Sequence, residues 1–212
     1  MRKILSLVLA LALIVSLALT VASCKKTVSI YDIFDASTPT KATSVVTYTD
    51  SNGAFEGVYV ITSSGEDFIF DYSYQRLRTF DEALAEGNSE TIKTVSGKLY
   101  YVGGTAVTVG DEFDSFVPAF DSAKLNLKEA FLSGVSYSDD GKALTATLSG
   151  ANIAKVLGVD PLSEGDVSIS VATDGTYARR FDVSYTTKSG ATVLIKTSYS
   201  YNPVTVELPS VG

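Results

Sequence analysis

Apolar and polar residues alternate along most of the chain after residue 41, and short clusters of turn-forming residues interrupt the alternation. A period of two directs successive side chains to opposite faces of a strand, so each alternating segment predicts a strand. Asn52-Gly53 is a strong hairpin signal, and Ser96-Gly97 predicts another hairpin. About nine strands are expected, over residues 42–50, 54–63, 66–77, 90–95, 98–104, 142–148, 166–173, 176–187 and 191–201. Tight connections make such a sheet antiparallel and mostly a meander.

Three segments carry helix signals instead of alternation. A Thr-Phe-Asp-Glu capping box opens residues 79–87, and a glycine supplies the stop. Residues 121–134 carry an apolar stripe at helical spacing and also end in glycine. Residues 149–161 begin with a serine cap and contain a third apolar stripe. We therefore expect three short helices, two of them in the middle of the chain.

The alternation gathers large apolar side chains on one face of neighbouring strands. Such a face has to be covered, and the mid-chain helices are the candidate cover. The expected fold is α+β but mainly β: a curved antiparallel sheet with two or three short helices over its concave face. Helices that fill the concavity would make this face a core, whereas a looser cover would leave a cavity for an acyl chain or another apolar ligand. The residues expected to line that cavity are Phe55, Tyr59, Ile61, Phe68, Phe70, Tyr72, Leu127, Phe131, Phe181, Val193, Ile195 and Tyr199.

The N-terminus is basic at Arg2 and Lys3 and then mostly apolar up to Ala22, a pattern typical of a secretory signal peptide. The apolar run ends in Val-Ala-Ser-Cys, which resembles a bacterial lipobox. The resemblance implies cleavage before Cys24, a diacylglyceryl thioether on its sulfur, and anchoring of the exported protein to the bacterial cell membrane or envelope. An uncleaved anchor helix with an unmodified cysteine is the alternative, since the run is also long enough to span a bilayer.

These features divide the chain into three parts. Residues 1–23 are expected to be the lipoprotein signal peptide, residues 24–41 the lipidated cysteine and a tether, and residues 42–212 a single β-rich domain. Within the tether, four apolar or aromatic residues are expected to dock onto the domain: Ile30, Tyr31, Ile33 and Phe34.

The residue inventory narrows the possible functions. The chain has no histidine and a single cysteine, which excludes Ser-His-Asp, Cys-His and histidine-metal chemistry. We expect no catalytic residue, no metal ligand and no cofactor, and interpret the protein as a non-enzyme. Its formal net charge of −7, without a basic patch, argues against a nucleic-acid partner.

The C-terminal part carries a family resemblance. Residues 177–209, YARRFDVSYTTKSGATVLIKTSYSYNPVTVELP, are a strand-turn-strand ending that follows a lipobox, a tether and a meander with inserted helices. This order of elements resembles the LolA/LppX-type lipoproteins. The resemblance implies an unclosed β-barrel, capped by helices, that binds or carries a lipid or another hydrophobic ligand. The alternatives are an interaction lipoprotein with a filled core that binds an envelope protein, and a carbohydrate-binding surface domain.

Overall fold

The fold is known from a computed structural model, which describes residues 28–49, 54–77, 92–111, 127–149, 152, 165–186 and 190–210. The predicted signal peptide, Cys24 and the predicted helix over 79–87 lie outside these residues, as does most of the predicted helix over 149–161. Within the described ranges, none of the helices has the length and apolar character needed to cross a bilayer.

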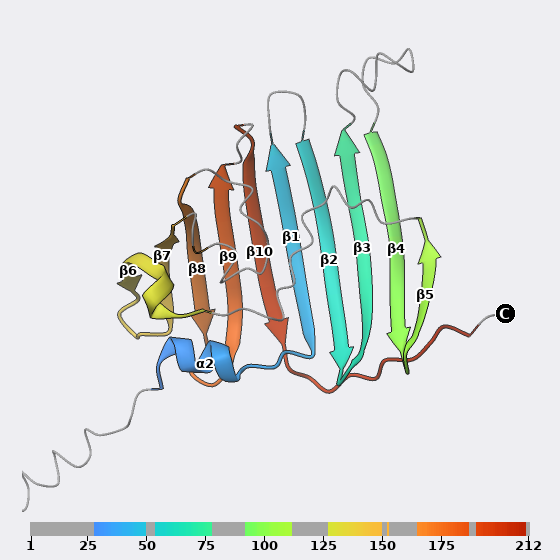
Figure 1. The fold of residues 1–212 in the computed structure, drawn as a ribbon, viewed down its shortest axis with the longest axis horizontal. Helices are drawn as coiled ribbons and strands as arrows, with labels where there is room; N and C mark the ends of the chain where they lie inside the picture. The colour runs from blue at the N-terminus through green and yellow to red at the C-terminus, as the bar shows by residue number, and fades with distance from the viewer. Residues whose placement is uncertain are drawn as a thin grey trace, which may run out of the picture.

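Ten antiparallel strands form one open sheet in the order β5-β4-β3-β2-β1-β10-β9-β8-β7-β6 (Figure 1). The prediction of a mainly β, curved antiparallel sheet is therefore confirmed. The strands are β1 (Lys41–Thr49), β2 (Ala54–Ser64), β3 (Asp67–Leu77), β4 (Ile92–Val102), β5 (Thr105–Gly110), β6 (Leu132–Tyr137), β7 (Ala143–Leu148), β8 (Val167–Thr173), β9 (Ala178–Thr186) and β10 (Thr192–Ser200).

The first and last strands pair in the middle of the sheet and divide it into two halves. The N-terminal half, β1 to β5, steps outward to one edge, and the C-terminal half, β6 to β10, steps back from the other edge (Figure 1). Across the seam between β1 and β10, Ser44 lies opposite Thr197 and Val46 opposite Ile195. The sequence predicts a meander within each half, but nothing in it signals the pairing that joins them.

The hairpin predicted at Ser96-Gly97 is wrong, because both residues lie inside β4. Gly97 is opposite Tyr72 of β3, and a Cβ atom added to Gly97 would stand 2.7 Å from Cζ of that tyrosine. The glycine thus makes room for an aromatic ring instead of forming a turn. The turn occurs at Gly103 and Gly104, whose φ angles of 57° and 79° suit a two-residue hairpin, and it leads into β5.

The expected tether contains a helix, α2 (Ile30–Ala36), that the sequence pattern does not predict. The helix begins at Ser29, whose hydroxyl accepts a hydrogen bond from the Tyr31 amide. Ile30, Ile33 and Phe34 are buried, and Tyr31 packs partly against the core, so the expected docking of these four residues is confirmed.

The helix predicted over 121–134 is wrong at its C-terminal end. Among its described residues, only Glu129–Phe131 form a short 3-10 helix (η2), and β6 begins directly afterwards. Leu132 pairs with Leu148 of β7, so strand pairing overrides the apolar stripe that suggested a helix. Within the third predicted helix, Asn152 is helical. Its backbone amide donates a hydrogen bond to the Ser149 carbonyl over 2.8 Å.

The C-terminal segment, residues 201–210, is extended but forms no strand. The Thr40 hydroxyl donates to the Asn202 carbonyl over 2.7 Å, and Pro203 has no amide hydrogen to offer a neighbouring strand. The chain therefore leaves the sheet after β10 and runs along the ends of the N-terminal strands (Figure 1). Val206 is buried there, at 8% exposure.

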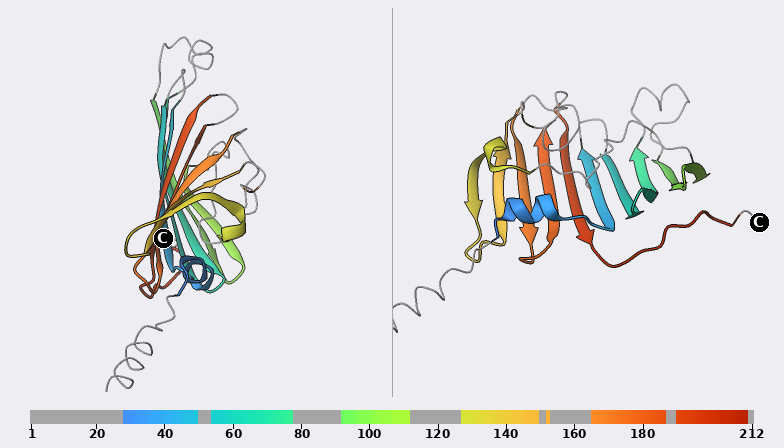
Figure 2. Two further views of the ribbon diagram at one scale, coloured as in Figure 1. Left: turned by 90° about the vertical axis from the view of Figure 1, so that its left-hand side faces the viewer. Right: turned by 60° about the horizontal axis from the view of Figure 1, so that its bottom comes forward.

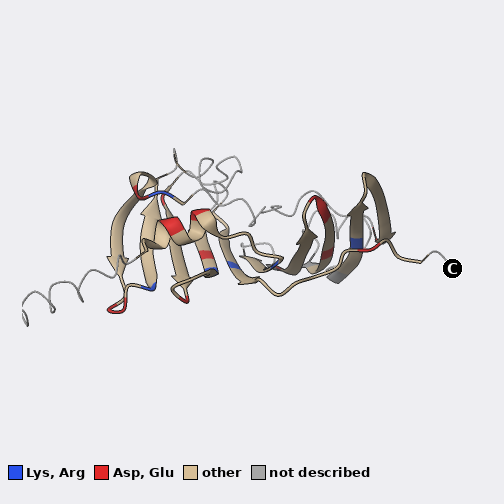
Figure 3. Ribbon diagram, turned by 90° about the horizontal axis from the view of Figure 1, so that it is seen from below, with Lys and Arg blue, Asp and Glu red and all other residues tan. Residues whose placement is uncertain are grey.

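The sheet is twisted and bent, and α2 lies on the inner side of the bend (Figures 2 and 3). We call the face that carries the side chains of Ser44 and Thr197 the inner face, and it includes every second residue along each strand. The opposite face, which carries the side chains of Val45 and Lys196, is the outer face. Few residues of the strands are basic or acidic (Figure 3). The buried apolar residues of the strands lie on the inner face, so the core forms there.

Candidate ligand-binding face

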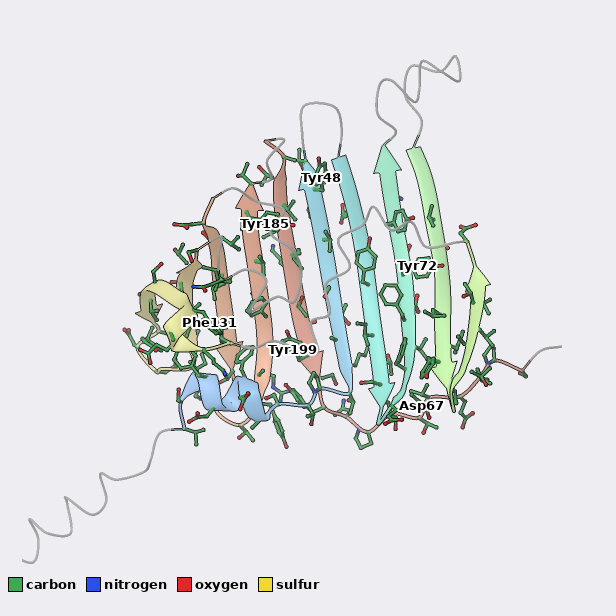
Figure 4. All side chains as sticks on the ribbon, viewed as in Figure 1. Tyr48, Asp67, Tyr72, Phe131, Tyr185 and Tyr199 are labelled. Atoms are coloured by element: carbon green, nitrogen blue, oxygen red, sulfur yellow. The ribbon has the colours of Figure 1, made fainter. Side chains whose placement is uncertain are left out.

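The strand register places every predicted cavity residue of the sheet on the inner face. These residues are Phe55, Tyr59, Ile61, Phe68, Phe70, Tyr72, Phe181, Val193, Ile195 and Tyr199. The side chain of Phe55 lies outside the described part. Leu127 and Phe131 reach the same core from the segment that precedes β6. Figure 4 shows Tyr48, Tyr72, Tyr185 and Tyr199 on this side of the sheet, from both halves.

The inner face of the C-terminal half is fully buried at its centre, although Tyr185 of β9 and Leu132 of β6 stay partly exposed. Leu148, Val171, Phe181 and Val183, which belong to three neighbouring strands, are all 0% exposed. The ring of Phe34 in α2 packs against Phe181, with centroids 6.4 Å apart, and against Tyr199 at 6.5 Å. Leu127, at 4% exposure, and Phe131 add to the cover. This half of the face is a packed core.

The inner face of the N-terminal half is covered less completely. Tyr72 and Tyr74 of β3 are buried, at 1% and 2% exposure, and so is Val95 of β4. Towards the Gly103–Gly104 turn, however, the same face carries five side chains that remain partly exposed. We call them the aromatic patch: Ile61, Phe68, Phe70, Leu99 and Tyr101.

Ring stacking orders the aromatic patch. Phe68 and Tyr101, directly opposite each other on β3 and β4, stack with centroids 5.3 Å apart and planes 19° apart. Phe70 stacks on Tyr59 at 6.1 Å and contacts Tyr72 at 5.6 Å, which links the patch to the buried tyrosines. The patch is therefore an ordered and partly exposed apolar surface.

Two glycines on the inner face fix the tyrosine rings. A Cβ at Gly57 would stand 2.9 Å from Tyr59 Cε2, and one at Gly97 would stand 2.9 Å from the Asp111 carbonyl oxygen. That carbonyl accepts a short hydrogen bond from the Tyr72 hydroxyl. The Tyr59 ring thus lies over Gly57 of its own strand, and the Tyr72 ring lies over Gly97 of the neighbouring strand β4, where larger residues would displace them.

A buried polar pair lies at the seam between the halves. The hydroxyls of Ser44 and Thr197 are 2.9 Å apart, and the two residues are 5% and 1% exposed. Each hydroxyl satisfies the other, so the pair avoids the penalty of an unmatched buried polar group. It marks the point where the apolar inner face is interrupted.

A second aromatic cluster lies at the turn between β8 and β9. Tyr177 stacks on Tyr201 at 4.5 Å, and the Arg179 guanidinium lies 5.6 Å from the Tyr177 ring centroid. The amides of Tyr177 and Thr176, and then Arg179, hydrogen-bond the Asp174 carboxylate and lower its pKa to about 2. This exposed cluster closes a turn.

The outer face carries a shallow hollow of about 370 Å³ over the C-terminal half. Five residues with hydroxyl groups contribute to its lining: Thr145, Thr147, Ser168, Ser170 and Ser184. Its carboxylate, Asp182, is ion-paired with Arg180, and none of its lining residues is aromatic. In the described part of the chain, acidic side chains do not gather into a group that could hold a metal ion.

Comparison with known proteins adds little. No family model and no curated protein matches the chain. Among solved structures, the 2.0 Å structure of the hypothetical protein CT021 from Chlamydia trachomatis is similar, with 15% sequence identity and a TM-score of 0.34. The match covers 86% of this chain and 98% of that one. A likeness at this level supports no conclusion about fold or function.

Two members of the aromatic patch, Leu99 and Tyr101, are not among the cavity residues predicted from the sequence. They share the inner face with Phe70 and Phe68 through the register of β3 and β4. The turn predicted at Ser96-Gly97 makes residues 98–104 a separate short strand, and the sequence pattern alone assigns this strand to neither face of the sheet. Their own alternation in residues 98–104 is the signal that places them once β4 is seen as continuous.

Proposed function

We propose that the protein is an exported, membrane-anchored lipoprotein that binds a lipid or another hydrophobic ligand on the aromatic patch. The observation that carries the proposal is the uneven cover of one apolar face: Leu148, Val171, Phe181 and Val183 of β7 to β9 are fully buried, whereas Phe68, Phe70 and Tyr101 stay partly exposed. An apolar surface on the concave side of a bent sheet suits an acyl chain. The anchoring rests on the lipobox around Cys24.

The number of methylenes that a ligand buries on the patch would set its affinity. Each methylene transferred from water to an apolar surface contributes about 0.8 kcal/mol. A chain that buries about eight methylenes would gain about 6 kcal/mol, which corresponds to an affinity between millimolar and micromolar before ordering costs. Such binding is reversible, as a carrier requires. The resemblance to LolA/LppX-type carriers agrees with this proposal and remains a prediction.

Native mass spectrometry of the protein starting after Cys24, extracted without detergent, tests the proposal. We expect adducts of acyl-chain mass on the wild type, fewer on Ile61→Glu, and an unchanged level on Val58→Glu. Val58 is a matched control because it lies on the outer face of the same strand, at 40% exposure. Adduct-free wild type would contradict the proposal, and so would equal loss in both variants.

The buried core of the C-terminal half favours a second candidate, an interaction lipoprotein that binds another envelope protein. A filled core leaves its edges and loops as contact surfaces. Cross-linking in intact cells would then yield one dominant protein partner and no lipid. The carbohydrate-binding alternative gains no support from the outer hollow, whose lining residues offer no ring on which a sugar could stack.

A further inference from the structure

The outermost strand of the N-terminal half, β5, is an exposed edge. It pairs with β4 on one side, and within the described residues no strand pairs with its other side (Figure 1). All of its residues except Val107 are exposed, with Val109 at 49%. The sequence Thr-Ala-Val-Thr-Val-Gly has four β-branched residues and no charge or proline. It therefore lacks the usual residues that protect an edge from pairing.

The ladder with β4 shows which backbone groups of β5 point away from the sheet. The two-residue turn makes Val102 and Thr105 a hydrogen-bonded pair, and such pairs alternate along an antiparallel ladder. The Asp111 amide, which donates to the Ser96 carbonyl over 3.0 Å, fits the same alternation. The amides and carbonyls of Ala106, Thr108 and Gly110 consequently face outward.

The opposite edge of the sheet is protected. The register of β6 with β7 shifts between Ser133 and Ser136, which marks a bulge, and Gly134 within it has a φ of 59°. A bulge twists an edge and interrupts its row of hydrogen-bonding groups. One open edge and one protected edge allow pairing to occur once, so that it ends in a closed dimer instead of a fibre.

We propose that β5 pairs antiparallel with β5 of a second copy of this chain, around a two-fold axis at Thr108. This register pairs all three outward-facing residues, Thr108 with its own copy and Ala106 with Gly110. On the outer face it sets Val107 against Val109, and no like charges oppose each other. A six-residue edge buries less than the roughly 1,000 Å² of a stable interface, so the dimer exchanges readily. The inference does not depend on the ligand proposed above.

Cross-linking of the full-length protein in the membranes of producing cells tests the dimer. Thr108→Cys, treated with a short bismaleimide, is expected to give a product of twice the protein's mass. Ser136→Cys on the protected edge is the matched control, and the wild type reports any background from Cys24. The Ser136→Cys variant and the wild type should both stay monomeric.

A second variant separates pairing from folding. Ala106→Pro in the Thr108→Cys protein removes an outward amide hydrogen and leaves the hydrogen bonds to β4 intact. The dimer yield should fall at least about tenfold, equivalent to about 1.4 kcal/mol of association, while resistance to trypsin is unchanged. A monomer, a cross-link to a different protein, or an equal yield from Ser136→Cys would overturn the proposal.

Discussion

Phe181 of β9 and Phe68 of β3 are phenylalanines on the inner face of the same sheet, yet the first is fully buried and the second remains partly exposed. The difference lies in what covers them. α2 packs onto the C-terminal half, whereas among the described residues the N-terminal half near the Gly103–Gly104 turn has the stacked rings of its own strands and the C-terminal segment along the strand ends. Both halves of the inner face carry alternating apolar residues, but the two halves differ in burial, and the less covered part is the candidate binding surface.

The largest expected effect compares these two phenylalanines directly. Phe181→Ala should lower the free energy of unfolding by about 3–5 kcal/mol, since it leaves a cavity in a sealed core. Phe68→Ala should lower it by about 1 kcal/mol, because water already reaches part of that side chain in the folded state. Urea unfolding measures both. Equal losses would show that the two halves are packed alike.

The next effect concerns the rings that border the patch. Gly97→Ala should destabilise the protein by about 1–3 kcal/mol, because the new methyl group overlaps the Tyr72 ring and the Asp111 carbonyl. Gly165→Ala is the matched control, since nothing lies within 4 Å of its Cβ position. The melting temperature of Gly97→Ala should therefore be clearly lower than that of Gly165→Ala. A harmless Gly97→Ala would mean that the tyrosine is not fixed over β4.

The seam between the halves should show a smaller, coupled effect. Ser44→Ala or Thr197→Val alone should cost about 1–2 kcal/mol, since each leaves one buried hydroxyl unmatched. The double variant should cost less than the sum by about 1 kcal/mol, because it removes both hydroxyls together. A double-mutant cycle in urea measures this coupling. Strict additivity would mean that the two hydroxyls do not interact across the seam.

The smallest effect comes from the exposed charge cluster at the end of the C-terminal half. A carboxyl whose pKa is lowered in the folded state stabilises the fold above its ordinary pKa of about 3.9, and this contribution is lost as the pH falls. Since the pKa of Asp174 is lowered to about 2, the stability difference between wild type and Asp174→Asn should vanish towards pH 2. Unfolding at pH 6 and pH 2 checks this, and a pH-independent difference would contradict it.

The sequence predicts well the elements whose signals are local. Alternation bounded by turn residues locates β1 to β3 and β7 to β10 to within a few residues. Three elements are missed: α2 is ordered by burial against the distant β9, whereas β5 and β6 pair with the strands next to them in the chain, β4 and β7. The same holds for the candidate site, because the parity of side chains gives the apolar face but not its cover. The contact between Ser44 and Thr197, 153 residues apart, has no local signal at all.

Photolabelling with a fatty acid that carries a diazirine on its chain tests the central claim most directly. Irradiation of the bound complex, followed by peptide mapping, should place the label on β2 to β4, at Phe68, Phe70 and Tyr101. Labels on the outer face, on α2 and β8 to β10, or spread evenly over the chain would contradict binding at the aromatic patch.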